Sequence, residues 1–241
     1  MSYEVMKKML LLNWPIFARG AWITIYISII GTVIGSIIGL LVGLVRTIPT
    51  PKTRFRKLIF KIANIFLSIY IDFFRGTPMM VQAMVLYFGT ASAFGLQIDR
   101  TFAAVLIVSI NTGAYMSEIV RGGIIAIDKG QFEAAQAIGM NHFTTMKEII
   151  LPQVIRNILP ATGNEFVVNI KDTSMLSVIG VSELFFQTNS IAGINFKYTE
   201  AFFITSVIYL VMTLTITKVL RRLEIKLAGN KTYAMIEDKV E

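Results

Sequence analysis

The sequence predicts an all-α membrane protein that crosses the bilayer five times. Of its 241 residues, 54% are hydrophobic and only 16% are charged, whereas a soluble domain carries about a quarter charged residues. The deficit lies in long charge-free runs, the longest of which cover 20–45 and 76–98. Since a helix needs about 20 apolar residues to span a bilayer, these runs predict one polytopic domain over most of the chain.

The apolar runs place five crossings along the chain, at 20–45, 58–90, 100–120, 154–180 and 199–219. They define a membrane domain, 20–225, between an extracytoplasmic N-terminal segment, 1–19, and a loose polar tail, 226–241. The N-terminal segment mixes apolar and polar residues, so we expect either an amphipathic helix on the outer surface or a poorly ordered leader. Lys7 and Lys8 precede an apolar stretch that is too short for a cleavable signal peptide.

Basic residues orient these crossings. Sixteen lysines and arginines fall on the side that holds the first and third connections and the C-terminal tail, whereas five fall on the other side. Because cytoplasmic loops are enriched in Lys and Arg, we expect the N-terminus outside and the C-terminus in the cytoplasm. This placement accounts for the net charge of +8 without a nucleic-acid partner.

The second expected crossing is too long for one span and is interrupted by polar residues. Pro78 disfavours helix at the residue before it and removes a backbone donor, so we expect a break near Thr77. Asp72 and Arg75 are three residues apart and can pair on one helix face. We favour this structural pair over a role for Arg75 in a transport path.

A polar segment, about 128–152, connects the third and fourth crossings and fits the pattern E-A-A-x3-G-x9-I-x-L-P at all seven fixed positions. Residues 131–138 favour a helix, and Gly139 can supply a left-handed stop. Asn141 can cap a second helix, before Pro152 directs the chain back into the membrane. The alternative is an ordinary connecting loop.

The fourth expected crossing carries ionisable residues, which are costly inside a membrane and are functional candidates by default. Glu165 and Asn169 are four residues apart and share one helix face. Facing a cavity, they would offer a carboxylate and an amide to an amino acid; otherwise they bond to neighbouring helices. We expect Lys171 and Asp172, with the Thr and Ser that follow, to hold a helix break together.

The loop pattern resembles the EAA loop of permease subunits in type I ATP-binding-cassette importers. Residues 74–82 and 164–174 resemble the R-G-T-P-L-L-V-Q and N-E-F…K-D-T-S segments of permeases for polar amino acids, a family that includes histidine, arginine and glutamine importers. Residues 111–115 and 118–123 also fit, and a leucine pair of the family is Met79-Met80 here. The resemblance covers about residues 15–225.

This resemblance implies a subunit of an amino-acid importer in the cytoplasmic membrane of a bacterium. The implied partners are a second permease copy or a related permease, two ATPase subunits, an extracytoplasmic amino-acid-binding protein, the amino acid and membrane lipid. Glu165 and Asn169 are the implied substrate contacts. The residues implied to contact the ATPase belong to the loop and are Glu133, Ala134, Ala135, Gly139, Met140, Asn141 and His142.

No catalytic or metal site is expected in this chain. It has no Walker A sequence, so we expect ATP and Mg²⁺ on the partner ATPase and no cofactor in the permease itself. It has no cysteine and a single histidine, which leaves no basis for a thiolate or histidine metal cluster. Two alternatives stay open: a channel or secondary transporter that needs no ATPase, and a membrane scaffold without a transport path.

Overall fold

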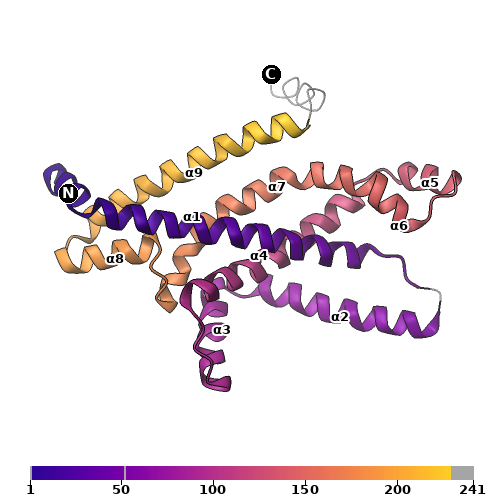
Figure 1. The fold of residues 1–241 in the computed structure, drawn as a ribbon, viewed down its shortest axis with the longest axis horizontal. Helices are drawn as coiled ribbons and strands as arrows, with labels where there is room; N and C mark the ends of the chain where they lie inside the picture. The colour runs from indigo at the N-terminus through magenta and orange to yellow at the C-terminus, as the bar shows by residue number, and fades with distance from the viewer. Residues whose placement is uncertain (1, 52, 229–241) are drawn as a thin grey trace.

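The computed structural model describes residues 2–51 and 53–228, which form an elongated bundle of helices without a strand among them (Figure 1). This confirms the all-α prediction. In chain order the elements are α1 (Tyr3–Thr47), α2 (Arg54–Gly76), α3 (Met79–Phe94), α4 (Arg100–Ile125), α5 (Lys129–Ala137), α6 (His142–Thr145), the π-helical turn η1 (Met146–Ile150), α7 (Leu151–Asp172), the 3₁₀ segment η2 (Thr173–Ile179), α8 (Leu184–Asn195) and α9 (Tyr198–Ala228).

Three of the described helices, α1, α4 and α9, are long and apolar enough to cross a bilayer. The second and fourth expected crossings are each interrupted, the fourth (154–180) where α7 gives way to the 3₁₀ segment η2 ahead of α8. The second consists of α2 and α3, with the break at Thr77 where the sequence predicts it. The fourth runs through α7 and η2 into α8.

The N-terminal segment is the first part of α1. This helix continues through Pro15 without interruption for 45 residues, or roughly 67 Å at about 1.5 Å per residue. Phe17 is fully buried in a cluster with Leu184 of α8 and Ala201 of α9. The segment is therefore neither a separate surface helix nor a loose leader, because its apolar side packs on two other helices. Of the expected polar tail, residues 229–241 lie outside the described residues.

Helices α1 and α4 pack closely side by side and run parallel. Four glycines of α1, each four residues from the next, lie in turn against Val108, Thr112, Met116 and Val120 of α4. A Cβ atom at any of these glycines would come within 2.3–2.7 Å of α4, so only glycine permits this approach. We call this contact the glycine seam; its members are Gly31, Gly35, Gly39 and Gly43.

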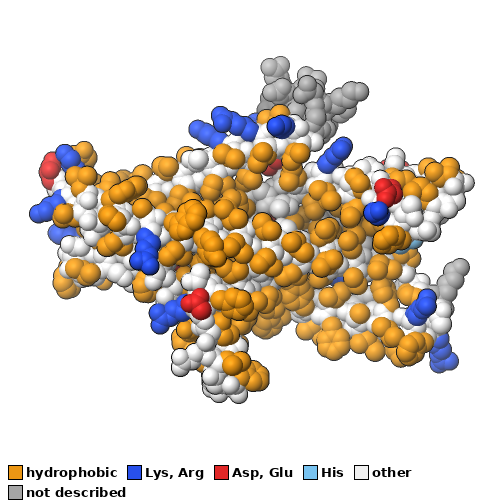
Figure 2. Space-filling view, viewed as in Figure 1, with side chains coloured by type: hydrophobic (Ala, Val, Ile, Leu, Met, Phe, Trp, Pro, Cys, Tyr) orange, Lys and Arg blue, Asp and Glu red, His pale blue; other side chains and the backbone are white. Residues whose placement is uncertain are grey.

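The bundle has two distinct ends. The N-terminus and the α8–α9 turn lie at one end, and the α1–α2 connection, α5, α6 and the end of α9 lie toward the other (Figure 1). Hydrophobic side chains cover much of the visible face between them (Figure 2). The loops that the basic residues assign to one side of the membrane are thus grouped at one end of the molecule.

Candidate functional site

The loop between α4 and α7 is a well-formed helix–turn–helix. Asp128 caps α5 by accepting a hydrogen bond from the Gly130 amide at 2.6 Å. Gly139 ends the first helix with a φ of 81°. The amide of Met140 donates to the Ala135 carbonyl and that of Gly139 to the Gln136 carbonyl, both at 3.0 Å, which is a Schellman motif. The predicted left-handed stop at Gly139 is confirmed.

The second helix of the loop begins at the predicted cap. Asn141 accepts a hydrogen bond from the Thr144 amide at 2.9 Å. The helix then continues through α6, η1 and α7 without a break at Pro152. Pro152 is the second residue after the π-helical turn, so its missing N–H falls where the regular i→i−4 pattern is already interrupted. The expectation that Pro152 redirects the chain is therefore wrong, and the irregularity is the π-helical turn Met146–Ile150 before it.

One side of the loop is anchored and the other is open. Ala135 is 1% exposed, and Phe132 packs on a cluster that includes Ile124 of α4 and Val154 of α7. Ile138 and Phe143, by contrast, are 77% and 75% exposed. These two residues were not among the predicted contacts, although large apolar side chains in a polar turn are a signal for a binding surface. Of the predicted ATPase contacts, Met140 is half-buried and Ala135 is buried, and the exposed ones are Glu133, Ala134, Gly139, Asn141 and His142.

The break between α2 and α3 is covered by two amide side chains. Gln82 Nε2 donates to the carbonyl oxygens of Phe74 and Thr77 at 2.9 and 2.8 Å. Asn111 Nδ2, from α4, donates to Gln82 Oε1 at 2.9 Å and to the Phe74 carbonyl at 3.2 Å. Non-helical backbone inside a membrane needs such partners, so this network makes the interruption at Pro78 tolerable.

The break after α7 is stabilised in the same way. Thr173 and Ser174 donate their hydroxyls to the carbonyls of Ile170 and Lys171 at 2.9 and 2.7 Å. Both contacts lie at the change from α7 to the 3₁₀ segment η2, and the role expected of Lys171 and Asp172 in holding this break stays a prediction. No ion pair of Lys171 or Asp172 occurs within the described part of the chain.

Glu183, which the sequence analysis did not consider, begins α8. Its carboxylate is fully buried and accepts from the amides of Phe185 and Phe186 at 2.8 and 2.7 Å. It also accepts from the Tyr209 hydroxyl of α9 at 3.1 Å. Three donors compensate the burial of one carboxylate, so Glu183 fixes the start of α8 against α9.

The two breaks meet at one cavity of about 260 Å³. Thr77 and Pro78 come from the first break, and Asp172 lies at the start of the second. Glu165 is half-buried on the wall that α7 contributes. Segments far apart in the sequence thus converge on a small space that carries both polar and apolar groups. The full lining is Thr77, Pro78, Met79, Asn111, Tyr115, Glu165, Val168, Asn169, Asp172 and Met175.

Asn169 lies in the wall of this cavity with its amide already engaged. It is 2% exposed, and its Nδ2 donates to the hydroxyls of Thr32 in α1 and Thr112 in α4 at 2.8 and 2.9 Å. Both amide hydrogens are therefore used inside the protein. Asn169 thus links α1, α4 and α7, which agrees with the alternative that it bonds to neighbouring helices. Glu165 is the ionisable residue of the predicted pair.

Arg75 and Asp72 do not form the expected ion pair, since none joins them in the described structure. The Arg75 guanidinium instead lies 5.5 Å from the centre of the Tyr115 ring. The spacing permits a pair, but the end of α2 packs on α4 and brings an aromatic face closer to the cation. Because Tyr115 lines the cavity, Arg75 lies at its rim.

A charged cluster joins α1 and α4 toward the end of the bundle that carries the loop. Glu118 accepts a hydrogen bond from Arg121 at 2.8 Å and also pairs with Arg46 of α1. The pair of Glu118 with Arg121 is local, since the two residues are three apart on α4. The added contact to Arg46 comes from the close approach of the two helices along the glycine seam.

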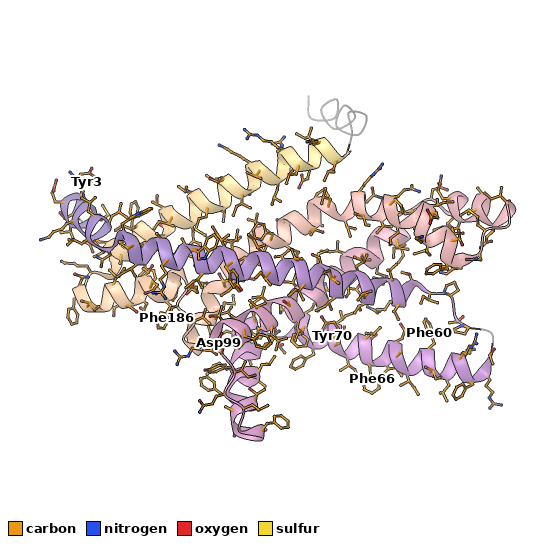
Figure 3. All side chains as sticks on the ribbon, viewed as in Figure 1. Tyr3, Phe60, Phe66, Tyr70, Asp99 and Phe186 are labelled. Atoms are coloured by element: carbon orange, nitrogen blue, oxygen red, sulfur yellow. The ribbon has the colours of Figure 1, made fainter. Side chains whose placement is uncertain are left out.

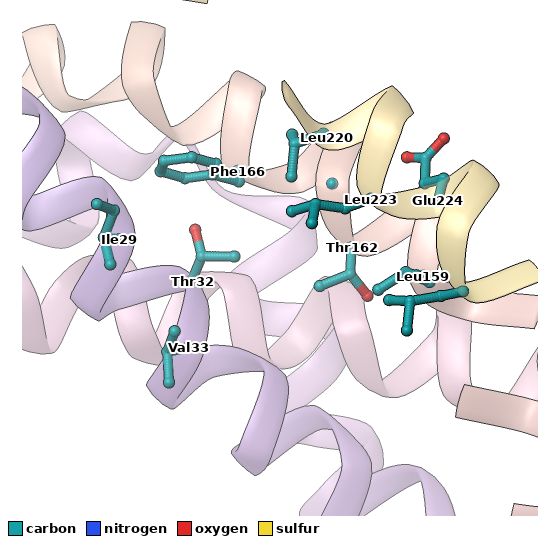
Figure 4. Close-up of a pocket in the computed structure, with 11 residues that line it drawn as sticks. Ile29, Thr32, Val33, Leu159, Thr162, Phe166, Leu220, Leu223 and Glu224 are labelled. Carbon is teal, nitrogen blue, oxygen red and sulfur yellow. The ribbon is translucent and has the colours of Figure 1, made fainter. Parts of the chain in front are cut away.

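A second hollow, of about 240 Å³, lies between α1, α7 and α9 (Figure 4). Its labelled lining is mostly aliphatic and aromatic, with the hydroxyls of Thr32 and Thr162 and the Glu224 carboxylate at its edges. The cavity at the two breaks is lined by two carboxylates and two amides, so it is the better candidate for a polar ligand.

Several known proteins resemble this chain over most of its length. Residues 55–228 match the family described as binding-protein-dependent transport system inner membrane component. The glutamine transport system permease protein GlnP of Escherichia coli K12 is 41% identical over 211 residues, which cover 87% of this chain and 92% of that protein. The arginine transport system permease protein ArtQ of Bacillus subtilis 168 is 40% identical over 163 residues, which cover 68% and 74%.

Solved structures share the fold. An amino acid ABC transporter crystallised with histidines superposes with a TM-score of 0.78 at 38% identity, covering 93% of this chain and 98% of that one. The MetNI methionine ABC transporter in an inward-facing conformation gives a TM-score of 0.70 at 19% identity, covering 94% and 99%. Because its identity is only 19%, the similarity to MetNI concerns the fold alone.

Proposed function

Because the chain belongs to the family of binding-protein-dependent transport system inner membrane components, we propose that it is the permease subunit of an ATP-driven importer for a polar or basic amino acid. Glutamine, arginine and histidine are the candidate substrates, given the proteins that it resembles. The site would lie in a bacterial cytoplasmic membrane, within a chain of five crossings.

The observation that carries this proposal is the cavity where two interrupted helices meet. Transport sites in membranes commonly form where helices are discontinuous, because the unwound backbone and nearby side chains face the ligand. Here Glu165 and Asp172 offer carboxylates for an ammonium or guanidinium group. The charged groups of the lining are these carboxylates, and Arg75 contacts the lining through the Tyr115 ring, 5.5 Å from its guanidinium.

The EAA loop supplies the proposed link to the motor. Its first helix is held to α4 and α7 through Phe132, while Ile138 and Phe143 protrude. Such a rigid, partly apolar projection suits a groove on a cytoplasmic ATPase. ATP and Mg²⁺ would be bound by that ATPase, and the permease would supply no cofactor. Two permease copies, identical or related, would present two loops to two ATPase subunits.

In this arrangement the N-terminus and the α8–α9 turn face outward, and the loop and the C-terminus face the cytoplasm. The lysines and arginines of the first and third connections and the C-terminal tail support this orientation, because cytoplasmic loops are enriched in these residues. An extracytoplasmic binding protein would deliver the amino acid at the outer end. Closure of the ATPase pair would move the two loops, and these would tilt the helices so that the cavity opens alternately to each side.

The first experiment is purification of the tagged chain from its native host in mild detergent, with mass spectrometry of stoichiometric partners. We expect an ATPase and a second permease, and we expect Ile138→Asp with Phe143→Asp to lose the ATPase. Ile194→Asp is the matched control, because Ile194 is 79% exposed and belongs to α8 at the opposite end (Figure 1). A chain that purifies alone and transports in liposomes would favour a channel or secondary transporter.

The second experiment tests the cavity. Glu165→Gln removes the charge and keeps the size of the side chain, so we expect the complex to assemble and its order of preference among arginine, histidine and glutamine to change. Glu148→Gln is a control on an exposed carboxylate of the loop. Identical uptake across the three amino acids in wild type and Glu165→Gln would remove Glu165 from the substrate path.

A further inference from the structure

A groove with polar groups in its walls runs between α7 and α9. Its volume is about 380 Å³, and it shares no lining residue with the cavity at the two breaks. The polar side chains are Asn164 of α7 and Thr217, Arg221 and Glu224 of α9, and the rest of the lining is apolar or glycine. We call this space the α7–α9 groove.

The two charges of the groove do not pair with each other. Arg221 and Glu224 are three residues apart on α9, a spacing at which opposite charges can pair. Neither has an ion pair among the residues that the structure describes. Arg221 is exposed and Glu224 is half-buried. The groove therefore presents one cation and one anion side by side, each open to a ligand.

The groove lies at membrane depth. Asn164 follows Arg156, at the edge of the EAA loop, by eight residues, or roughly 12 Å along α7 at about 1.5 Å per residue. Glu224 reaches α7 at the same level, because a Cβ atom on Gly163 would lie 3.3 Å from its Oε1. Half of the hydrocarbon core is about 15 Å thick, so these groups lie within one leaflet. Charges at such a depth require a polar partner.

An apolar hollow adjoins the groove. It is the space between α1, α7 and α9 in Figure 4, and Gly163, Leu220 and Glu224 line both spaces. Two side chains of its lining, Val33 and Leu227, are 54% and 57% exposed, so the hollow can be reached from the surface of the bundle. A polar groove next to an aliphatic hollow, both at membrane depth, suits a phospholipid.

The charges select the headgroup. Lys218, Arg222 and Lys226 are also exposed on α9, and nitrogen-tipped side chains project from the second half of this helix away from the bundle (Figure 3). Such a basic cluster attracts any lipid phosphate. Inside the groove, however, Glu224 would repel a second negative charge. A headgroup with a phosphate and an ammonium matches both Arg221 and Glu224.

We propose that the α7–α9 groove binds a phospholipid with a phosphoethanolamine headgroup, from the leaflet on the side of the EAA loop. Its phosphate accepts from the Arg221 guanidinium, its ammonium donates to Glu224, and an acyl chain lies along the apolar hollow. Only the assignment of this leaflet to the cytoplasmic side rests on the proposed function. An amino acid carries the same two charges, but it has no tail for the aliphatic hollow.

The test is competition between lipids. The assembled complex in mild detergent is mixed with equimolar phosphatidylethanolamine, phosphatidylcholine and phosphatidylglycerol and repurified, and native mass spectrometry identifies the retained phospholipids. Arg222→Gln is the matched control for Arg221→Gln and Glu224→Gln, because Arg222 is exposed on the same helix and lines neither space. We expect wild type and the control to select phosphatidylethanolamine, and each groove variant to retain at least about tenfold less, because a hydrogen bond to a charged group is lost.

Four results would overturn the proposal. Equal retention of phosphatidylethanolamine and phosphatidylcholine would show that the ammonium makes no hydrogen bond. A preference for phosphatidylglycerol that Glu224→Gln leaves unchanged would reduce the site to general attraction by the basic cluster. Displacement of the lipid by saturating glutamine, arginine or histidine would assign the groove to an amino acid. A disulfide between two copies through Thr217→Cys, in a chain without natural cysteine, would show that a second copy covers the groove.

A second measurement controls for folding and separates this proposal from the importer assignment. In nanodiscs, phosphatidylethanolamine should raise the apparent Tm of wild type and Arg222→Gln above the value in phosphatidylcholine, because a bound ligand stabilises the folded state. Arg221→Gln should match wild type in phosphatidylcholine and gain nothing. Selective retention by a chain that purifies without an ATPase would keep the lipid site and remove the importer. A co-purifying ATPase with no selective retention would do the reverse.

Discussion

Replacing Gly39 with alanine tests the packing that holds α1 to α4. The added Cβ would lie 2.3 Å from Met116 Cβ and 2.8 Å from the Met116 carbonyl carbon. Carbon atoms make favourable contact at about 3.5–4.0 Å, so the helices must separate by roughly 1.2 Å. Rotation of the Met116 side chain does not relieve the clash, because the atoms that are met are its Cβ and backbone.

The expected magnitude follows from two opposing effects. Overpacking of this kind costs about 1–3 kcal/mol, and alanine in place of glycine within a helix regains about 0.5–1 kcal/mol. We therefore expect Gly39→Ala to lower the free energy of unfolding by up to about 2.5 kcal/mol, with a central value near about 1 kcal/mol. For a chain of this size, that is a fall in the apparent Tm of up to about 10 °C.

The assay is thermal unfolding of the purified complex in detergent, followed by size-exclusion fluorescence. Gly122→Ala is the matched control, because Gly122 lies in α4 and a Cβ there meets nothing within 4 Å. We expect this control to keep or raise the apparent Tm by a few degrees, through its helix propensity of up to about 1 kcal/mol. Equal shifts for both variants would refute the argument that the seam requires glycine.

Three further predictions use the same assay. Gln82→Leu should cost about 1–3 kcal/mol, because it leaves the Thr77 carbonyl without its side-chain donor and the Phe74 carbonyl with only the Asn111 amide; an unchanged Tm would contradict the proposed cover of the break. Glu183→Gln should cost a similar amount, about 1–3 kcal/mol, because an amide accepts at only one of its two atoms, and a rise in Tm would be the opposing result. Asp72→Asn and Arg75→Gln should add within about 0.5 kcal/mol, as expected for side chains that do not interact, and a coupling above about 1 kcal/mol would restore the ion pair.

Local chemistry explains what the sequence could predict. The stop at Gly139, the cap at Asn141 and the break at Thr77 each depend on one residue and its immediate neighbours, and the structure shows all three. The pair of Glu118 with Arg121 is equally local. Such features follow from backbone geometry and short spacings, which a sequence displays directly.

The remaining features depend on contacts between distant segments. The Asn169 amide is used by threonines 57 and 137 residues away along the chain, and Gly39 meets Met116 only because two helices run in parallel. Arg75 had a permitted partner three residues away, but the packing of α2 on α4 brought Tyr115 closer. Neither the glycine seam nor the buried carboxylate of Glu183 was predicted, because each depends on contacts with residues that are distant in the sequence.

The anchoring of the EAA loop has a mechanical consequence. Phe132 joins α5 to the same cluster that holds α1, α4 and α7 together, so the loop is not attached by a flexible hinge. Asn111 and Ile125 are separated by roughly 21 Å of rigid α4, at about 1.5 Å per residue. Under the proposed coupling, a push on the loop would act on a lever whose far arm is the cavity wall, and a tilt of about 10° over this length would displace the far end by about 4 Å.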